Sequence, residues 1–244
     1  MKFGVLVFPG SNCDHDTHHV LGAVLGQPVT YLWHESHSLE NCDAILVPGG
    51  FAYGDYLRTG AIARFAPIMQ SVTRFAASGG LVMGICNGFQ ILCEAGLLPG
   101  ALVRNDCLEF RCITQTIHVE ESTERFNRSL LGARLRIPIA HGEGNYRIDD
   151  AGLDDLVTHR QILFRYADSS GTVNAAGNPN GSLANIAGIR NRAGNVFGMM
   201  PHPERAVEAH HPSVDGLAIL RAFLHSRLIP SEVADEIDAS VPLV

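Results

Sequence analysis

Met83-Gly84-Ile85-Cys86-Asn87-Gly88 follows the apolar pair Leu81-Val82 and leads directly into the helical stretch Phe89–Leu92. A short apolar run that turns at once into a helix predicts a strand–turn–helix unit, and the residue at the turn is Cys86. The glycines on both sides of Cys86 relieve the crowding that so sharp a turn creates. The sequence therefore predicts a nucleophile elbow, a turn that lifts one reactive side chain above the end of a sheet.

Cys86 has the position of a nucleophile, but it also suits a buried core position, because free cysteines are among the most buried residues. A thiol at a helix N-terminus is biased toward the thiolate by the helix dipole and by the free N–H groups of the first turn. The backbone amide of Asn87 is placed to serve as half of an oxyanion hole. The presence of a candidate base elsewhere in the chain favours the interpretation of Cys86 as a nucleophile.

The candidate base is His202, in the segment 199–204, Met-Met-Pro-His-Pro-Glu, which follows the apolar run Val196–Gly198. If this segment is extended, His202 and Glu204 share one face, because side chains two apart point the same way. A cysteine nucleophile needs a nearby imidazole, and the imidazole needs a third group to hold its tautomer. We therefore predict a catalytic triad of Cys86, His202 and Glu204.

A third element, Leu46-Val47-Pro48-Gly49-Gly50-Phe51, is a strand end followed by two glycines. No side chain blocks the backbone there, so the amide of Gly50 is predicted to be the second oxyanion donor beside Asn87. Phosphate binding is the alternative for Gly49–Gly54, but the segment has neither a Gly-Lys-Ser/Thr ending nor Gly-x-Gly-x-x-Gly spacing.

Apolar strand candidates alternate with helical candidates in the first part of the chain, which is the pattern of a parallel sheet covered by helices on both faces. The expected strands are Lys2–Phe8, Val29–Trp33, Ala44–Val47 and Leu81–Ile85, and the expected helices are Thr17–Leu25 and Ala61–Ala77. Later strand candidates have little helix between them and indicate an additional mixed or antiparallel portion. They are Phe110–Val119, Arg136–Ala140, Ile162–Tyr166, Asn185–Ile189 and Val196–Met199, followed by a last helix at Gly216–His225.

The composition fits one domain over residues 1–244, with a core at about 2–228 and a C-terminal tail at about 229–244. The net charge of −7 and the absence of a Lys/Arg tract argue against a nucleic-acid partner. No apolar stretch approaches a membrane span, and no signal peptide is evident, so we expect no membrane partner and a cytoplasmic location. The six cysteines then read as reduced thiols.

Several polar features have two interpretations. Cys13 also follows a strand, but without paired glycines a packing or hydrogen-bonding role is favoured over a nucleophile. The cluster Asp14–His19 could ligate a metal, yet such clusters are more often the solvated first turn of a helix, so no metal site is predicted. Gln90 is either an exposed helical glutamine or a pocket residue one turn beyond Cys86. His141 and Glu143 belong to a polar turn or to a loop near the substrate.

The chain resembles class I glutamine amidotransferases, and among them the glutaminase-subunit family of phosphoribosylformylglycinamidine synthase. The elbow and the His-Pro-Glu segment mark the superfamily. The narrower resemblance lies in the segments Phe8–Asp14, Pro48–Arg58, Pro138–Gly144 and Asn178–Ser182. The segment Ala206–Ser213, with His210 and His211, departs from the family pattern.

The resemblance implies a flavodoxin-like open, mostly parallel sheet and glutamine hydrolysis at Cys86. It assigns Gln90, His141 and Glu143 to the glutamine site. It implies no cofactor in this chain, with ATP and Mg used by a partner synthetase. The implied partners are a large synthetase subunit (PurL), which receives the ammonia for the conversion of formylglycinamide ribonucleotide, and a small subunit (PurS).

Two other classes stay open at this point. A hydrolase with the same elbow, such as a γ-glutamyl hydrolase or a cysteine peptidase, would act without an ammonia acceptor. A non-catalytic regulatory domain would keep the fold, although the presence of Cys86, His202 and Glu204 together argues against it.

Overall fold

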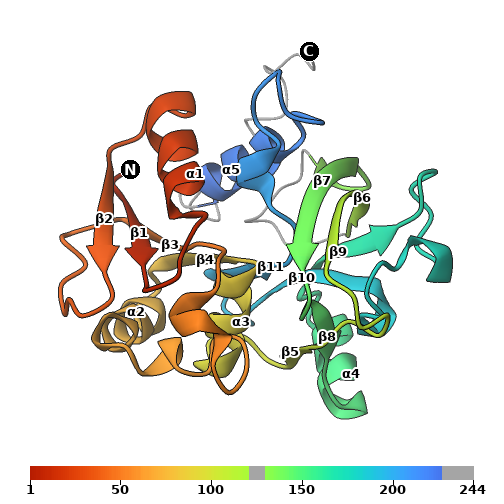
Figure 1. The fold of residues 1–244 in the computed structure, drawn as a ribbon, viewed down its shortest axis with the longest axis horizontal. Helices are drawn as coiled ribbons and strands as arrows, with labels where there is room; N and C mark the ends of the chain where they lie inside the picture. Colours follow the sequence, from red (N-terminus) through yellow and green to blue (C-terminus); the bar gives the residue numbers. More distant parts are fainter. Residues whose placement is uncertain (121–129, 227–244) are drawn as a thin grey trace.

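The computed structural model describes residues 1–120 and 130–226 (Figure 1). Within these residues nine strands form one sheet in the order β2-β1-β3-β4-β11-β10-β9-β6-β7, and β5 pairs with β8 separately. The strands are β1 (Phe3–Val7), β2 (Val29–Trp33), β3 (Ala44–Val47), β4 (Leu81–Ile85), β5 (Ala101–Val103), β6 (Arg111–Val119), β7 (Arg134–His141), β8 (Asn145–Arg147), β9 (Ile162–Ala167), β10 (Ile186–Arg190) and β11 (Val196–Met199).

The half of the sheet from β2 to β11 is parallel, which confirms the predicted α/β class. Strands β3 and β4 are buried along their whole length, as expected of strands covered on both faces. In Figure 1, helices α1 (Asp14–His19) and α5 (Gly216–His225) lie on one side of these strands, and α2 (Pro67–Ala77) and α3 (Asn87–Glu94) lie on the other.

The half from β10 to β7 is antiparallel and continues the same sheet. The predicted antiparallel portion is therefore confirmed, and it is an extension of the sheet that carries the elbow. In this arrangement β7 contacts the loop after β11, where the backbone N–H of His202 donates to the carbonyl of Pro138 at 2.8 Å.

Some local predictions were wrong. The helix expected at Ala61–Ala77 begins only at Pro67, because the residue before a proline is driven out of the helical region and Ala66 is extended at ψ 141°. Helix α4 (Asp150–Thr158) was missed, although Asp149 caps it by accepting a hydrogen bond from the N–H of Gly152. The C-terminal tail predicted at 229–244 lies outside the described residues.

The first helix begins earlier than predicted, at Asp14, and continues as a π-helical stretch, η1 (Val20–Val24). Short 3₁₀ turns, η2 (Ala52–Asp55), η3 (Ala63–Phe65) and η7 (Pro203–Arg205), lie in the loops after β3 and β11. No helix in the two described ranges is long and apolar enough to cross a membrane.

Candidate active site

The elbow at Cys86 has the predicted geometry. Cys86 precedes the first residue of α3 with φ 52° and ψ −106°, a strained conformation for a residue with a side chain. Its N–H donates to the carbonyl of Met199 on β11 at 2.7 Å, so the turn is anchored to the neighbouring strand. A helix N-terminus thus lies directly under the buried thiol.

The flanking glycines serve close packing. A Cβ on Gly88 would lie 1.8 Å from the carbonyl oxygen of Val47, and one on Gly84 would lie 2.6 Å from the carbonyl group of Gly88. Neither distance is possible, so the start of α3 can approach β3 and β4 this closely only with glycine at both positions. The strained φ belongs to Cys86 itself.

His202 reaches the elbow because β11 runs parallel to β4 and pairs with it directly. Its Nδ1 lies 2.6 Å from Oε1 of Glu204, and both side chains are almost completely buried. The contact is the predicted one, but the backbone is not extended. Pro203 starts the 3₁₀ turn η7, and the turn brings the two side chains together.

The electrostatics of this pair favour the protonated form of His202, which can donate a proton. Burial alone would lower the pKa of His202, but the negative charge of Glu204 and the nearby Cys86 and Cys13 thiols raise it well above its ordinary value. Because Glu204 accepts the Nδ1 proton, Nε2 is the ring nitrogen left for proton transfer. The Cys86 Sγ lies 3.7 Å from the carbonyl oxygen of Ala140, at the end of β7.

The two predicted oxyanion donors belong to the loop after β3 and to the first turn of α3, which are held together by a hydrogen bond. The side-chain Oδ1 of Asn87 accepts a hydrogen bond from the N–H of Ala52 at 3.0 Å, which fixes the loop after β3 against the elbow. Gly50 has φ 145°, and a Cβ there would lie 2.8 Å from the backbone N of Asn12. Glycine is therefore required at Gly50.

Gln90 is buried, so it is not the exposed helical glutamine that was one of its two interpretations. Its Nε2 donates to the carbonyl oxygen of Glu143 at 2.5 Å, and its Oε1 accepts from Nδ2 of Asn87 at 3.0 Å. The Glu143 carboxylate accepts from the Thr59 hydroxyl at 3.0 Å. Gln90 and Glu143 thus meet beside the elbow and join α3 to the loop after β7.

His141 is also buried, and its protonation state is set by Asn105. The Oδ1 of Asn105 accepts from the N–H of Gly144 at 3.0 Å and lies 3.2 Å from His141 Nδ1, which must therefore be the donor. Burial, with the positive charge of His202 as the second cause, lowers the pKa of His141 to about 4. His141 is therefore a neutral imidazole with Nε2 as an acceptor.

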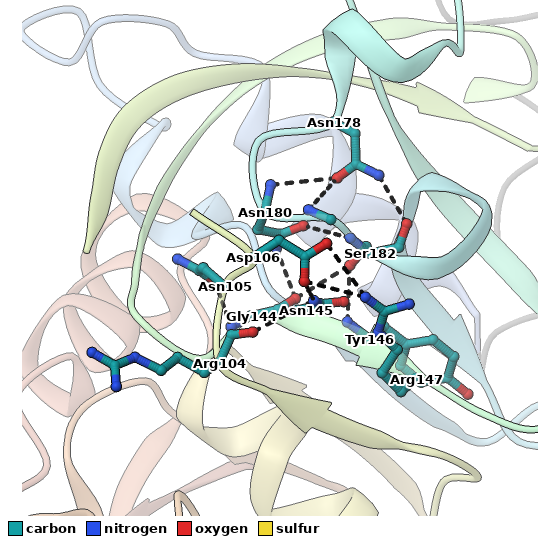
Figure 2. Close-up of polar contacts among 11 residues, drawn as sticks. Arg104, Asn105, Asp106, Gly144, Asn145, Tyr146, Arg147, Asn178, Asn180 and Ser182 are labelled. Atoms are coloured by element: carbon teal, nitrogen blue, oxygen red, sulfur yellow. Dashed lines mark hydrogen bonds and ion pairs between the residues drawn. The ribbon is translucent and has the colours of Figure 1, made fainter. Parts of the chain in front are cut away.

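Sequence reasoning missed the polar network that holds this loop (Figure 2). Asn180 Nδ2 donates to the carbonyl of Gly144 at 2.8 Å, and the Ser182 hydroxyl accepts from the N–H of Tyr146 at 2.9 Å. The Nδ2 of Asn105 donates to the carbonyls of Glu109 and His141, both at 2.9 Å. The only signal in the sequence was the segment Asn178–Ser182.

Four buried polar atoms around the elbow have no hydrogen-bond partner within residues 1–120 and 130–226. They are His202 Nε2, Glu204 Oε2, His141 Nε2 and the Tyr166 hydroxyl. Burial raises the pKa of Tyr166, and Cys86 is the second cause, which places that phenol in the same region. Buried polar groups without partners are rare, and their concentration here is typical of a site that takes a polar ligand.

The class of protein follows from comparisons with known families. A family model described as a CobB/CobQ-like glutamine amidotransferase domain matches residues 1–216. A putative GMP synthase protein from Thermoplasma acidophilum, 16% identical with a TM-score of 0.60, shares the fold over 93% of each chain.

Relatives with higher sequence identity indicate a particular subfamily. Phosphoribosylformylglycinamidine synthase subunit PurQ of Koribacter versatilis is 60% identical over 92% of this chain and 97% of its own. PurQ of Moorella thermoacetica is 60% identical over 92% and 95%. A chain in the structure of PurLQS from Thermotoga maritima is 41% identical, with a TM-score of 0.79 over 91% and 97%. The chain belongs to the amidotransferase family above and, within it, to the family of PurQ subunits.

Proposed function

We propose that this chain is the glutaminase subunit of a phosphoribosylformylglycinamidine synthase and that Cys86, His202 and Glu204 are its catalytic triad. The observation that carries the proposal is the convergence of three strand ends. The loop after β3, the elbow after β4 and the His202–Glu204 pair after β11 lie at the carboxyl edge of adjacent parallel strands. Open α/β sheets bind ligands at this edge.

In the proposed reaction the Cys86 thiolate attacks the carboxamide carbon of glutamine. The oxygen that becomes negative is held by the N–H groups of Gly50 and Asn87. His202 donates its Nε2 proton to the departing nitrogen, so ammonia leaves and a γ-glutamyl thioester remains. Water then attacks the thioester with His202 as the base, which releases glutamate and restores the thiol. Glu204 stabilises the imidazolium at both stages.

Gln90, His141 and Glu143 are proposed to form the glutamine site. Each belongs to the network that joins α3 to the loop after β7, and His141 offers a neutral acceptor nitrogen. A neutral His141 does not itself protonate the released ammonia.

The ammonia is proposed to pass to a large synthetase subunit, with a small third subunit in the assembly. The support is the related chain from Thermotoga maritima, which belongs to a structure of PurLQS. We propose that this synthetase, and not the present chain, uses ATP and Mg²⁺. We also propose a cytoplasmic location, which the six free cysteines support because reduced thiols are typical of that compartment.

The test is a glutaminase assay of the purified chain with and without synthetase, ATP and formylglycinamide ribonucleotide. We expect low activity alone and at least a tenfold rise in the complex, because partner contact stabilises the aligned form of the loops at Gly50–Arg58 and His141–Gly144. A tenfold rise needs only about 1.4 kcal/mol of preferential binding. Equal rates alone and in the complex would instead support a stand-alone hydrolase.

A further inference from the structure

Two histidine-containing segments that are far apart in the sequence meet on the surface behind the proposed triad. His19 lies on α1, and its Nε2 is 3.1 Å from Oε2 of Glu208. Glu208 belongs to the loop after η7 and is followed closely by His210 and His211. Potential ligand atoms of Glu208, His210 and His211 all lie within 4.8 Å of one another. Neither segment has a part in the proposed hydrolysis of glutamine.

The pocket that these residues line reaches the back of Glu204. His19, Glu208, His210 and Glu204 all line it, together with Asp16 and Arg205. Glu204 is only 2% exposed, and its Oε2 has no hydrogen-bond partner in the part of the chain that the structure describes. The cluster therefore shares a pocket with a buried carboxylate that has an unsatisfied oxygen, and such a carboxylate favours a nearby cation.

Not every residue of the cluster is free to bind a metal ion. His211 Nδ1 accepts hydrogen bonds from the N–H groups of Val207 and Glu208 at 3.1 and 3.2 Å, so its ring is fixed by the loop. The ring of His210 packs against it, with centroids 4.3 Å apart. The remaining candidates are Glu208 and the two histidines beside it, because His19 lies 3.1 Å from Glu208 and a ligand atom of His210 lies within 4.8 Å of it in the same pocket.

We propose that His19, Glu208 and His210 bind a zinc ion at this pocket, with water completing the coordination. Imidazole nitrogen and carboxylate oxygen are zinc ligands, and three protein ligands leave one position open. Calcium and magnesium prefer oxygen alone and fit this set poorly. The nearby positive charge of Arg205 is balanced, because its Nε lies 3.0 Å from Oδ2 of Asp16.

A cation at this position acts on the triad through Glu204, a consequence that rests on the proposed catalytic role of that residue. The charge of the ion stabilises the ionised carboxylate, so less of the carboxylate's field is left to stabilise the imidazolium of His202. Zinc bound behind Glu204 thus lowers the basicity of His202 and inhibits glutamine hydrolysis.

Binding is tested by isothermal titration of ZnCl₂ into protein without a polyhistidine tag, in a Cys86→Ala background. That background removes the reactive thiolate as a competing ligand and makes the result independent of catalysis. We expect one zinc ion per chain, and about tenfold or greater loss of affinity in His19→Asn, Glu208→Gln and His210→Asn. His37→Asn, in the exposed loop after β2, is the matched control and should bind like the parent.

Two results overturn the site. One is zinc affinity unchanged in all three ligand variants. The other is binding that is lost only in Cys13→Ser, because Cys13, His202 and Glu204 form a second group of possible ligands within 4.8 Å. In active protein, zinc should inhibit glutamine hydrolysis. The His210→Asn variant should need an about tenfold higher zinc concentration for the same inhibition. If His210→Asn is inhibited at the same zinc concentration as the parent, the inhibitory ion binds at Cys86 instead.

Discussion

Cys86 and Cys13 occupy corresponding positions in two strand–turn–helix units of one parallel sheet, yet their environments differ. Cys86 follows β4 with φ 52°, whereas Cys13 precedes α1 with an unstrained φ of −103°. The thiol of Cys13 is 3.1 Å from Oδ1 of Asn12 and 3.2 Å from the Arg205 guanidinium. Burial raises the pKa of Cys13, although the nearby His202 opposes this effect.

Nearness to the base therefore does not by itself make a nucleophile. Both thiols lie close enough to His202 to affect its pKa. Both cysteines also precede a helix, but only Cys86 lies at a strained turn directly after a strand. Cys13 is held by polar neighbours on the side of Glu204, where it supports the position of the base.

Replacing each of the two thiols should give the greatest difference in activity. Cys86→Ala should reduce glutamine hydrolysis by the complex to background, because it removes the proposed nucleophile. Cys13→Ala should keep the rate within about tenfold, because it removes only a contact around the base. A diazo-ketone analogue of glutamine followed by mass spectrometry should label Cys86 alone. Label on Cys13 would reverse the assignment.

The next effect concerns the acid that orients the base. Glu204→Gln should slow turnover about ten- to a thousandfold, because a neutral amide cannot stabilise the imidazolium of His202 as a carboxylate does. Cysteine–histidine pairs depend on this group less than serine triads. Steady-state kinetics of the assembled complex provide the measurement, with circular dichroism as a control for folding. An unchanged rate would remove Glu204 from the triad.

Asn105 tests whether the antiparallel half contributes to the elbow. Asn105→Ala removes the acceptor that holds His141 Nδ1 and the N–H of Gly144, so His141 loses its fixed tautomer. We expect about tenfold lower kcat/KM, because one misplaced group near the substrate is sufficient for such a loss. Asn180→Ala, which removes a bond to the carbonyl of Gly144, should have a smaller effect in the same direction. A lower melting temperature with unchanged kinetics would leave Asn105 a structural role only.

The parts that sequence could predict are local. The bounds of β2, β3, β4 and α5 match the predicted ranges, because each is a short apolar or amphipathic run between clear breakers. The elbow was predictable for the same reason, since its strand, turn and glycines lie within the eight residues from Leu81 to Gly88. Pro67 was also a local signal, and the prediction of a helix through it was wrong.

The parts that sequence could not predict depend on distant pairs. Asn105 meets His141 across 36 residues, and Arg205 meets Cys13 across 192. Nothing in the composition or spacing of these residues indicates such contacts, because they arise only when the antiparallel half and the loop after β11 pack against the parallel strands. For the same reason His19 and Glu208 could not be joined from sequence.

The two cysteine turns also differ in the environment of a nearby aspartate. This difference is expected to have a small effect on the stability of the fold. At the Cys13 turn, Asp16 is paired with Arg205 at 3.0 Å. At the Cys86 turn, Asp55 is half-buried and faces Glu143, and burial followed by this repulsion raises its pKa from 3.8 to about 6. A carboxyl whose pKa is raised on folding contributes stability below pH 4, which is lost as the pH rises through about 6.

Asp55→Asn removes the charge and should therefore raise the melting temperature at pH 7 but not at pH 4. With allowance for solvent screening at this half-buried position, we expect a gain of about 1 kcal/mol, or about 2–4 °C for a chain of this length. Asp16→Asn, at the other turn, is the matched control and should give no gain at pH 7, because it breaks an ion pair. Thermal unfolding of each variant at both pH values provides the measurement. A gain for Asp55→Asn that is equal at pH 4 and pH 7 would show that the charge of Asp55 is not the cause.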